Sequence, residues 1–181
     1  MTLRFPVLRG LYEAFPTAVD DVGIPAGDDD CLDLLGSLAT AAAWTAAISL
    51  CAYILPRREA VWWGCQSLRA MQPPSPHEAV ILEVAEAWVR RPDEPQRRAA
   101  LDLGTQSDAS LPATWMAFAA AWSGGSIVPP EYACVPAPPE QTARSVRAGL
   151  MIAVAQLPED LARDILKPCM DAGIQIVSGP R

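Results

Sequence analysis

The chain has 181 residues, a length that suits one domain with a single hydrophobic core. Hydrophobic residues make up 51% of the sequence, and the formal net charge is -7. An acidic chain lacks the basic surface that phosphate contacts need, so we expect no nucleic-acid binding. Alanine and leucine dominate over β-branched and aromatic residues, which favours an all-α fold.

Prolines and glycines interrupt residues 1–30, whose apolar residues show too little periodicity for a long helix. We therefore predict an irregular leader over residues 1–30 and a single helical domain over residues 31–181. The acidic stretch from Asp28 to Asp33 suits the start of the first helix of that domain, because carboxylates favour the positive end of the helix dipole. Its spacing does not match an EF-hand loop.

The segment from Leu34 to Leu55 contains 22 residues without a charge and is followed by Pro56 and two arginines. A run of this length is long enough for a membrane-spanning helix. Only seven of its residues are Leu or Ile, and most others are small or weakly polar. We favour two buried helices over residues 31–55, with a candidate break at residues 36–37, and keep a membrane anchor as the alternative.

Local signals divide the remaining sequence into helices. One helix is expected over residues 57–71, and a capping box at residues 75–78 opens the next, over residues 76–91. Further helices are expected over residues 93–102, 112–123 and 140–157 and from residue 158 to about residue 170 or beyond, and a proline-rich loop covers residues 128–139. This pattern predicts a compact antiparallel array of about seven to eight helices, with a short α-solenoid-like stack as the alternative.

Side chains suited to catalysis or metal binding are few. His77 is the sole histidine, and the five cysteines include no C-x-x-C pair. These residues do not assemble a general base with a nucleophile or a set of zinc ligands, so we predict no enzymatic activity, no cofactor and no metal. The odd number of cysteines and the lack of a secretory signal favour the cytoplasm.

Three arginine doublets stand out: Arg57 and Arg58, Arg90 and Arg91, and Arg97 and Arg98. The first doublet begins one predicted helix and the second ends the next, so antiparallel packing would bring both to one pole, with the third nearby. Because arginine binds carboxylates bidentately, such a pole would hold an acidic protein surface. The simpler interpretation is a solvated helix end, neutralised by neighbouring acidic residues.

Six tryptophans are a large number for this length, and core packing is their default role. Trp62 and Trp63 follow the first arginine doublet closely, and they are the best candidates for an exposed position. An exposed tryptophan beside arginines has the composition of a protein-binding hot spot. The proline-rich loop over residues 128–139 is a second segment on which a partner would dock.

The segments PRREAVWWGC (56–65), EAWV (86–89), AWSGGS (121–126) and VPP (128–130) resemble an uncharacterised bacterial helical family that is often encoded near type VI secretion genes. The similarity covers about residues 56–157 and leaves the leader outside. It implies an accessory role and transfers no catalytic or binding residues.

These observations predict a cytoplasmic, non-enzymatic accessory or adaptor protein. Its partner is expected to be another protein, such as a component of a type VI secretion system. The candidate binding residues are Arg57, Arg58, Arg90, Arg91, Arg97, Arg98, Trp62 and Trp63. The alternative function is that of a membrane-associated component anchored by residues 34–55.

Overall fold

The computed structural model describes residues 5–128 and 132–179, and the regular structure in these ranges is helical. Its helices are α1 (Leu8–Ala14), α2 (Ala18–Val22), α3 (Cys31–Thr40), α4 (Trp44–Ile54), α5 (Arg57–Met71), α6 (Pro76–Arg90), α7 (Glu94–Gln106), α8 (Pro112–Ala121), α9 (Gln141–Val154) and α10 (Glu159–Ser178). The predicted all-α class is confirmed.

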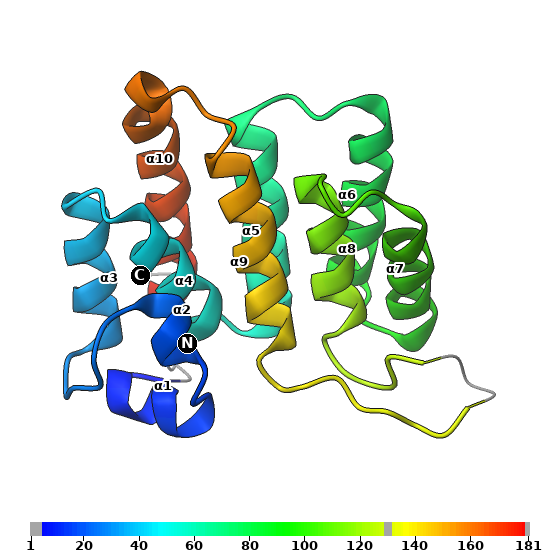
Figure 1. The fold of residues 1–181 in the computed structure, drawn as a ribbon, viewed down its shortest axis with the longest axis horizontal. Coiled ribbons are helices and arrows are strands. Elements are labelled where there is room, and N and C mark those ends of the chain that lie inside the picture. Colours follow the sequence, from blue (N-terminus) through cyan, green and yellow to red (C-terminus); the bar gives the residue numbers. More distant parts are fainter. Residues whose placement is uncertain (1–4, 129–131, 180–181) are drawn as a thin grey trace.

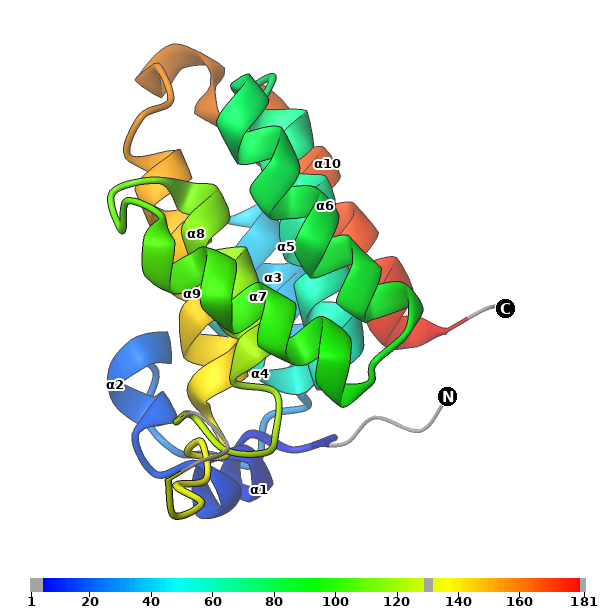
Figure 2. The ribbon, with the colours of Figure 1, turned by 90° about the vertical axis from the view of Figure 1, so that its right-hand side faces the viewer.

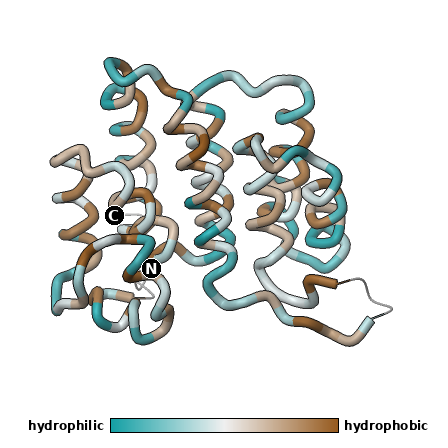
Figure 3. The backbone as a smooth tube through the Cα atoms, viewed as in Figure 1, coloured by the Kyte–Doolittle hydropathy of each residue, from teal (hydrophilic) through white to brown (hydrophobic). Residues whose placement is uncertain are grey.

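The helices lie side by side in a compact array (Figure 1). α3 and α10 lie toward one end and α6, α7 and α8 toward the other, with α5 and α9 between them. A view turned by 90°, with the α6, α7 and α8 end toward the reader, shows α7 lying against α6 and α8 (Figure 2). Hydrophobic and hydrophilic residues alternate along the helices, as expected where each helix turns one face to a shared core (Figure 3).

The first thirty residues are more regular than predicted, because they contain the helices α1 and α2. Leu8, Leu11 and Phe15 are buried and belong to the same core as the rest of the chain. Helices of seven and five residues have little stability of their own, so tertiary burial holds them in place. That is why periodicity gave no sign of them.

Asp21 of α2 joins this N-terminal segment to α4 and α9. Its carboxylate accepts a 2.6 Å hydrogen bond from Tyr53 Oη and lies 3.3 Å from Arg144 Nε and 3.5 Å from Arg147 Nη1. Burial, together with the bond to this carboxylate, raises the pKa of the Tyr53 phenol. The network thereby fixes how α2 sits on the helices of the main array.

Residues 34–55 lie in α3 and α4, which are separated at Ala42 and not at the predicted break at residues 36–37. The amide of Ala42 donates to the carbonyl of Ala39 at 3.2 Å, and the amide of Ala43 donates to that of Leu38 at 3.0 Å. These two bonds form a Schellman motif, which places Ala42 in the left-handed region with φ of 56°.

The two helices contain 10 and 11 residues, about half of the roughly 20 that a membrane span needs. Residues 47–54 of α4 are all buried within the protein. In the part of the chain that the structure describes, no helix has both the length and the apolar character to cross a membrane. Residues 34–55 thus do not form the spanning helix that the alternative function requires.

The local signals for the middle helices are confirmed. The Ser75 side chain accepts a bond from the Glu78 amide, and the Glu78 carboxylate accepts one from the Ser75 amide, so the predicted capping box is present. Asp93 accepts a 3.0 Å bond from the Gln96 amide at the start of α7. Each of these signals depends on neighbours in the sequence, which explains why the sequence revealed them.

Close contact between α8 and α9 depends on Gly149. A Cβ atom at this position would lie 2.8 Å from the carbonyl oxygen of Pro112 and 3.1 Å from the Cβ of Trp115. Another side of α8 carries aromatic rings, and there Phe118 stacks on Trp122 at a centroid distance of 4.5 Å and lies against Gly104 of α7. α8 therefore approaches α9 closely at a glycine on one side and packs against α7 through aromatic rings on the other.

Candidate protein-binding surface

The first and second arginine doublets lie at one pole of the molecule, as predicted. Arg58, in the first turn of α5, donates from Nε to the carbonyl oxygen of Val89, in the last turn of α6, at 2.6 Å. Both helix ends lie on the same edge in Figure 1. The guanidinium of Arg58 satisfies a helix-terminal carbonyl that has no partner within its own helix.

Arg57 is directed to the end of α8 and the loop that follows it. Its Nη1 donates to the carbonyl oxygen of Ser123 at 2.7 Å, and its Nη2 donates to that of Pro139 at 3.0 Å. These bonds connect the start of α5 with the segment just after α8 and with the last residue of the proline-rich loop. Arg57 is thus engaged within the chain, which is a structural role and not the predicted partner-binding one.

Arg97 is 4% exposed, in contrast to the predicted solvent-facing position. Its Nη1 donates to the carbonyl oxygen of Ala121 at 2.7 Å, and its Nε and Nη2 each donate to Glu94 at 2.7 Å. Gly125, with φ of 64°, closes the turn above this guanidinium, and a Cβ atom there would lie 3.0 Å from Arg97 Nε. Arg97 therefore caps the C-terminal end of α8.

Arg98 also serves the fold. It donates to Glu94 at 2.8 Å and to the carbonyl oxygen of Val128 at 2.6 Å. Hydrogen bonds from Arg97 and Arg98 lower the pKa of the Glu94 carboxyl to about 2.

Arg91 is exposed and pairs with Asp93, whereas Arg90 is exposed and takes part in no ion pair among the described residues. The pole therefore offers chiefly Arg58 and Arg90 to a partner.

Trp62 and Trp63 are neighbours in sequence but differ in their surroundings. Trp63 is 1% exposed, and its Nε1 donates to the carbonyl oxygen of Cys169 in α10 at 2.9 Å. Trp62 points to the surface and is 41% exposed. Successive helical residues point about 100° apart, so one can enter the core while the next faces solvent. Trp63 is therefore removed from the candidate binding residues, and Trp62 stays.

Two hollows adjoin Trp62. One, of about 330 Å³, lies between α5 and α6 and is lined by Arg58, Glu59, Trp62, Val89 and Arg90. The other, of about 230 Å³, lies between α5 and α10, and we call it the α5–α10 trough. It is lined by Trp62, Trp63, Gln66, Ser67, Ala70, Pro168, Cys169, Ala172 and Ile176. Trp62 forms a wall of both hollows, which makes it the centre of this surface.

The sequence analysis did not predict that α10 contributes residues to this candidate binding surface. α10 continues through Pro168 to Ser178. Its trough-lining residues are small or aliphatic and give no chemical signal of a site. The spacing of four between Pro168, Ala172 and Ile176 indicates that they share one face, but the sequence does not say that this face meets α5.

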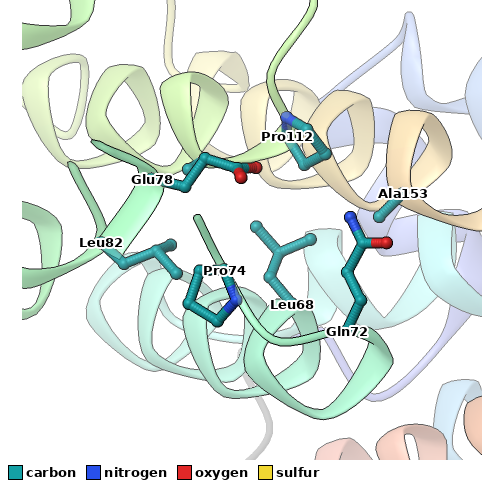
Figure 4. A pocket seen from close by; sticks show the side chains of 8 residues that line it. Leu68, Gln72, Pro74, Glu78, Leu82, Pro112 and Ala153 are labelled. Atoms are coloured by element: carbon teal, nitrogen blue, oxygen red, sulfur yellow. The ribbon is translucent and has the colours of Figure 1, made fainter. Parts of the chain in front are cut away.

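A third hollow, shown in Figure 4, lies where α5 ends and α6 begins. Leu68, Gln72, Pro74 and Glu78 are among its lining residues. Its volume is about 10 Å³, roughly the space of one water molecule. It is too small for an organic ligand.

Other polar groups are committed to packing. Glu86 is 8% exposed and accepts a 2.9 Å bond from Arg69 Nε between α5 and α6. Burial raises the pKa of the Cys51 and Cys65 thiols and that of Cys31 to about 11. In the described residues, no group of three or more His, Cys, Asp or Glu side chains is arranged to hold a metal ion.

These features define an all-α protein whose surface carries an exposed tryptophan between two hollows, one of them flanked by arginines. Residues 34–177 match a family of unknown function, DUF6931, and the chain belongs to this family. The match includes α4–α9 and most of α3 and α10, and it leaves α1 and α2 outside. Comparisons with curated proteins and with solved structures gave no match.

Proposed function

We propose that the protein is a non-enzymatic accessory or adaptor protein of the cytoplasm that binds another protein through the surface around Trp62. The partner proposed from the family resemblance is a component of a type VI secretion system. The observation that carries the proposal is the indole of Trp62, which is 41% exposed and forms a wall of both hollows.

The composition of this surface supports protein binding. Tryptophan and arginine are the residues most enriched in binding hot spots, and hot spots lie in pockets that become desolvated in the complex. Trp62 supplies the aromatic anchor, while Arg58 and Arg90 stand at the edge of the hollow beside it. Partner residues that enter the two hollows would cover the indole from both sides.

The buried thiols support a non-enzymatic role. The thiolate is the nucleophilic form of cysteine, and burial raises the thiol pKa of Cys31, Cys51, Cys65 and Cys169. His77 lies exposed in the first turn of α6 and does not line any of the hollows described above. A nucleophile activated by a neighbouring base is therefore not assembled from these groups.

Affinity capture from cells that naturally make the protein tests the proposal. The full chain is tagged, and the wild type is compared with Trp62→Ser and with Leu161→Ser. Leu161 is a matched control, because it is 47% exposed and lies outside both hollows. We expect a specific protein with the wild type and with Leu161→Ser, and at least tenfold less of it with Trp62→Ser. Equal recovery with all three would contradict the proposal.

A further inference from the structure

We infer that the occupant of this surface is an amphipathic helix of the partner protein, which lies along the α5–α10 trough with acidic residues directed to Arg58 and Arg90. This inference rests on the proposed function, because it specifies the partner segment that the same surface recognises.

The shape of the trough suits a helix. Its two walls are rows of residues spaced by four: Trp62, Gln66 and Ala70 on α5, and Pro168, Ala172 and Ile176 on α10. Such rows are the ridges of helix packing, and a third helix packs into the groove between two of them. The wall on α5 runs from Trp62 to Ala70, eight positions that rise about 12 Å along the helix. This length is close to the roughly 10.5 Å between the first and last residues of an i, i+4, i+7 stripe on a bound helix.

One pair of polar groups on the floor of the trough is already hydrogen-bonded. Trp63 Nε1 donates to the Cys169 carbonyl oxygen, so neither of these polar groups requires a partner from the ligand. The small side chains of Ala70 and Ala172 permit close approach of a backbone. An occupant therefore meets a mainly apolar lining along this stretch, which favours the apolar face of a helix over an extended strand that binds through its main chain.

Charge sets the orientation and chemistry of the occupant. The hollow on the other side of Trp62 carries two arginines, Arg58 and Arg90, and one acid, Glu59, within a chain of net charge -7. Arg58 Nε is held by the Val89 carbonyl, which fixes its guanidinium at the rim. An acidic side chain at one end of the partner's apolar stripe would meet this local positive charge.

A second copy of this chain is a less suitable occupant, because its charge does not complement that of Arg58 and Arg90. A two-fold symmetric dimer centred on Trp62 would bring the same patch of each copy together. Arg58 and Arg90 of one copy would then face their counterparts, and like charges across an interface are unfavourable. A separate acidic helix avoids this repulsion.

Site-specific photocrosslinking in the native cells identifies the occupant. A benzoylphenylalanine replaces Gln66 in the trough wall of the full chain, or replaces the exposed Val80 outside both hollows as a control. We expect Gln66, and not Val80, to crosslink to a segment with apolar residues at i, i+4 and i+7 and an acidic residue at one end.

A synthetic peptide of the crosslinked segment then tests the charge. We expect it to become helical on binding and to bind roughly tenfold more weakly to Arg90→Glu, but equally to wild type and to Arg163→Glu, the same charge reversal outside both hollows. A crosslink to a second copy, a segment without the stripe, or no effect of Arg90→Glu would overturn the inference and leave the proposed function standing. Equal crosslinking from both positions, with capture independent of Trp62, would overturn both.

Discussion

Arg97 shows how a charged side chain can be buried without being left unpaired. It lies 4% exposed between α7 and α8, where Glu94 neutralises it and the Ala121 carbonyl accepts one of its donors. Helix ends carry carbonyl groups that lack partners within the helix, and a long basic side chain from a neighbouring helix can satisfy them. The buried guanidinium thereby couples two helices through the backbone of one of them.

Replacement of Arg97 by methionine keeps much of the side-chain volume but removes these bonds. The Ala121 carbonyl then loses its donor, so we expect the free energy of unfolding to fall by about 1–3 kcal/mol. Arg91→Met is the matched control, because Arg91 is 69% exposed and its loss should change stability by less than about 0.5 kcal/mol. Urea unfolding followed by circular dichroism measures both. Similar unfolding midpoints for the two variants would refute the structural role of Arg97.

The ion pair between Glu94 and Arg97 makes the stability of the fold depend on pH. The folded-state pKa of Glu94, about 2, lies below the ordinary value of 4.5, so the ionised form stabilises the fold above about pH 4.5. This stabilisation is lost as the pH falls from about 4.5 to about 2. We therefore expect the difference in unfolding free energy between wild type and Glu94→Gln to shrink over that interval. Urea unfolding at several pH values checks it, and a difference independent of pH would contradict it.

Among the helical elements, the junction of α3 and α4 contains a residue in an unusual conformation. Ala42 has a positive φ, which costs an L-residue roughly 1–2 kcal/mol, and the Schellman bonds hold it there. Glycine adopts this conformation without the cost. We expect Ala42→Gly to stabilise the protein by about 1 kcal/mol.

The control for this prediction is Ala46→Gly within α4, which should instead destabilise the protein by about 1 kcal/mol. Thermal unfolding of the two variants gives the comparison directly. If Ala42→Gly lowers the melting temperature as Ala46→Gly does, the assigned conformation at the junction is wrong.

The elements that the sequence predicted well are those with local signals. The bonds of Ser75 with Glu78, and of Asp93 with Gln96, join residues three positions apart, so the helix starts could be read directly. α1 and α2 carry no such signal, and the bond of Asp21 to Tyr53 spans 32 positions. The break at Ala42 was missed because glycine is the usual residue at that position of the motif.

For the molecule as a whole, the cysteines report on global folding. Cys134 is exposed, whereas Cys31, Cys51, Cys65 and Cys169 are buried. We expect a maleimide at neutral pH to modify one thiol per native chain rapidly, and the others only at the rate at which the protein opens. Cys134→Ser should remove the rapid reaction. Mass spectrometry of timed samples counts the labels, and several rapid modifications in the wild type would contradict this picture.

The candidate site could be predicted only in part. The helix order placed Arg58 and Arg90 at one pole, because a short connection between helices favours antiparallel neighbours. α5 is apolar around much of its circumference, so periodicity could not decide which of Trp62 and Trp63 faces the core. Arg57 and Arg97 donate to backbone carbonyls and so are not available to a partner. The sequence could not predict this, because the acceptors lie 66 and 24 positions away.

The different surroundings of the two adjacent tryptophans give the protein an optical label at its proposed binding surface. An indole in contact with water emits at longer wavelength than one enclosed by apolar side chains. Of the six tryptophans, Trp62 is the exposed one, the other five being half-buried or buried, and it stands between the two hollows. Its emission should therefore shift to shorter wavelength as an occupant covers the hollows, and Trp62→Phe should abolish the shift. Fluorescence of the unmodified chain can thus follow occupancy in real time, without any added dye.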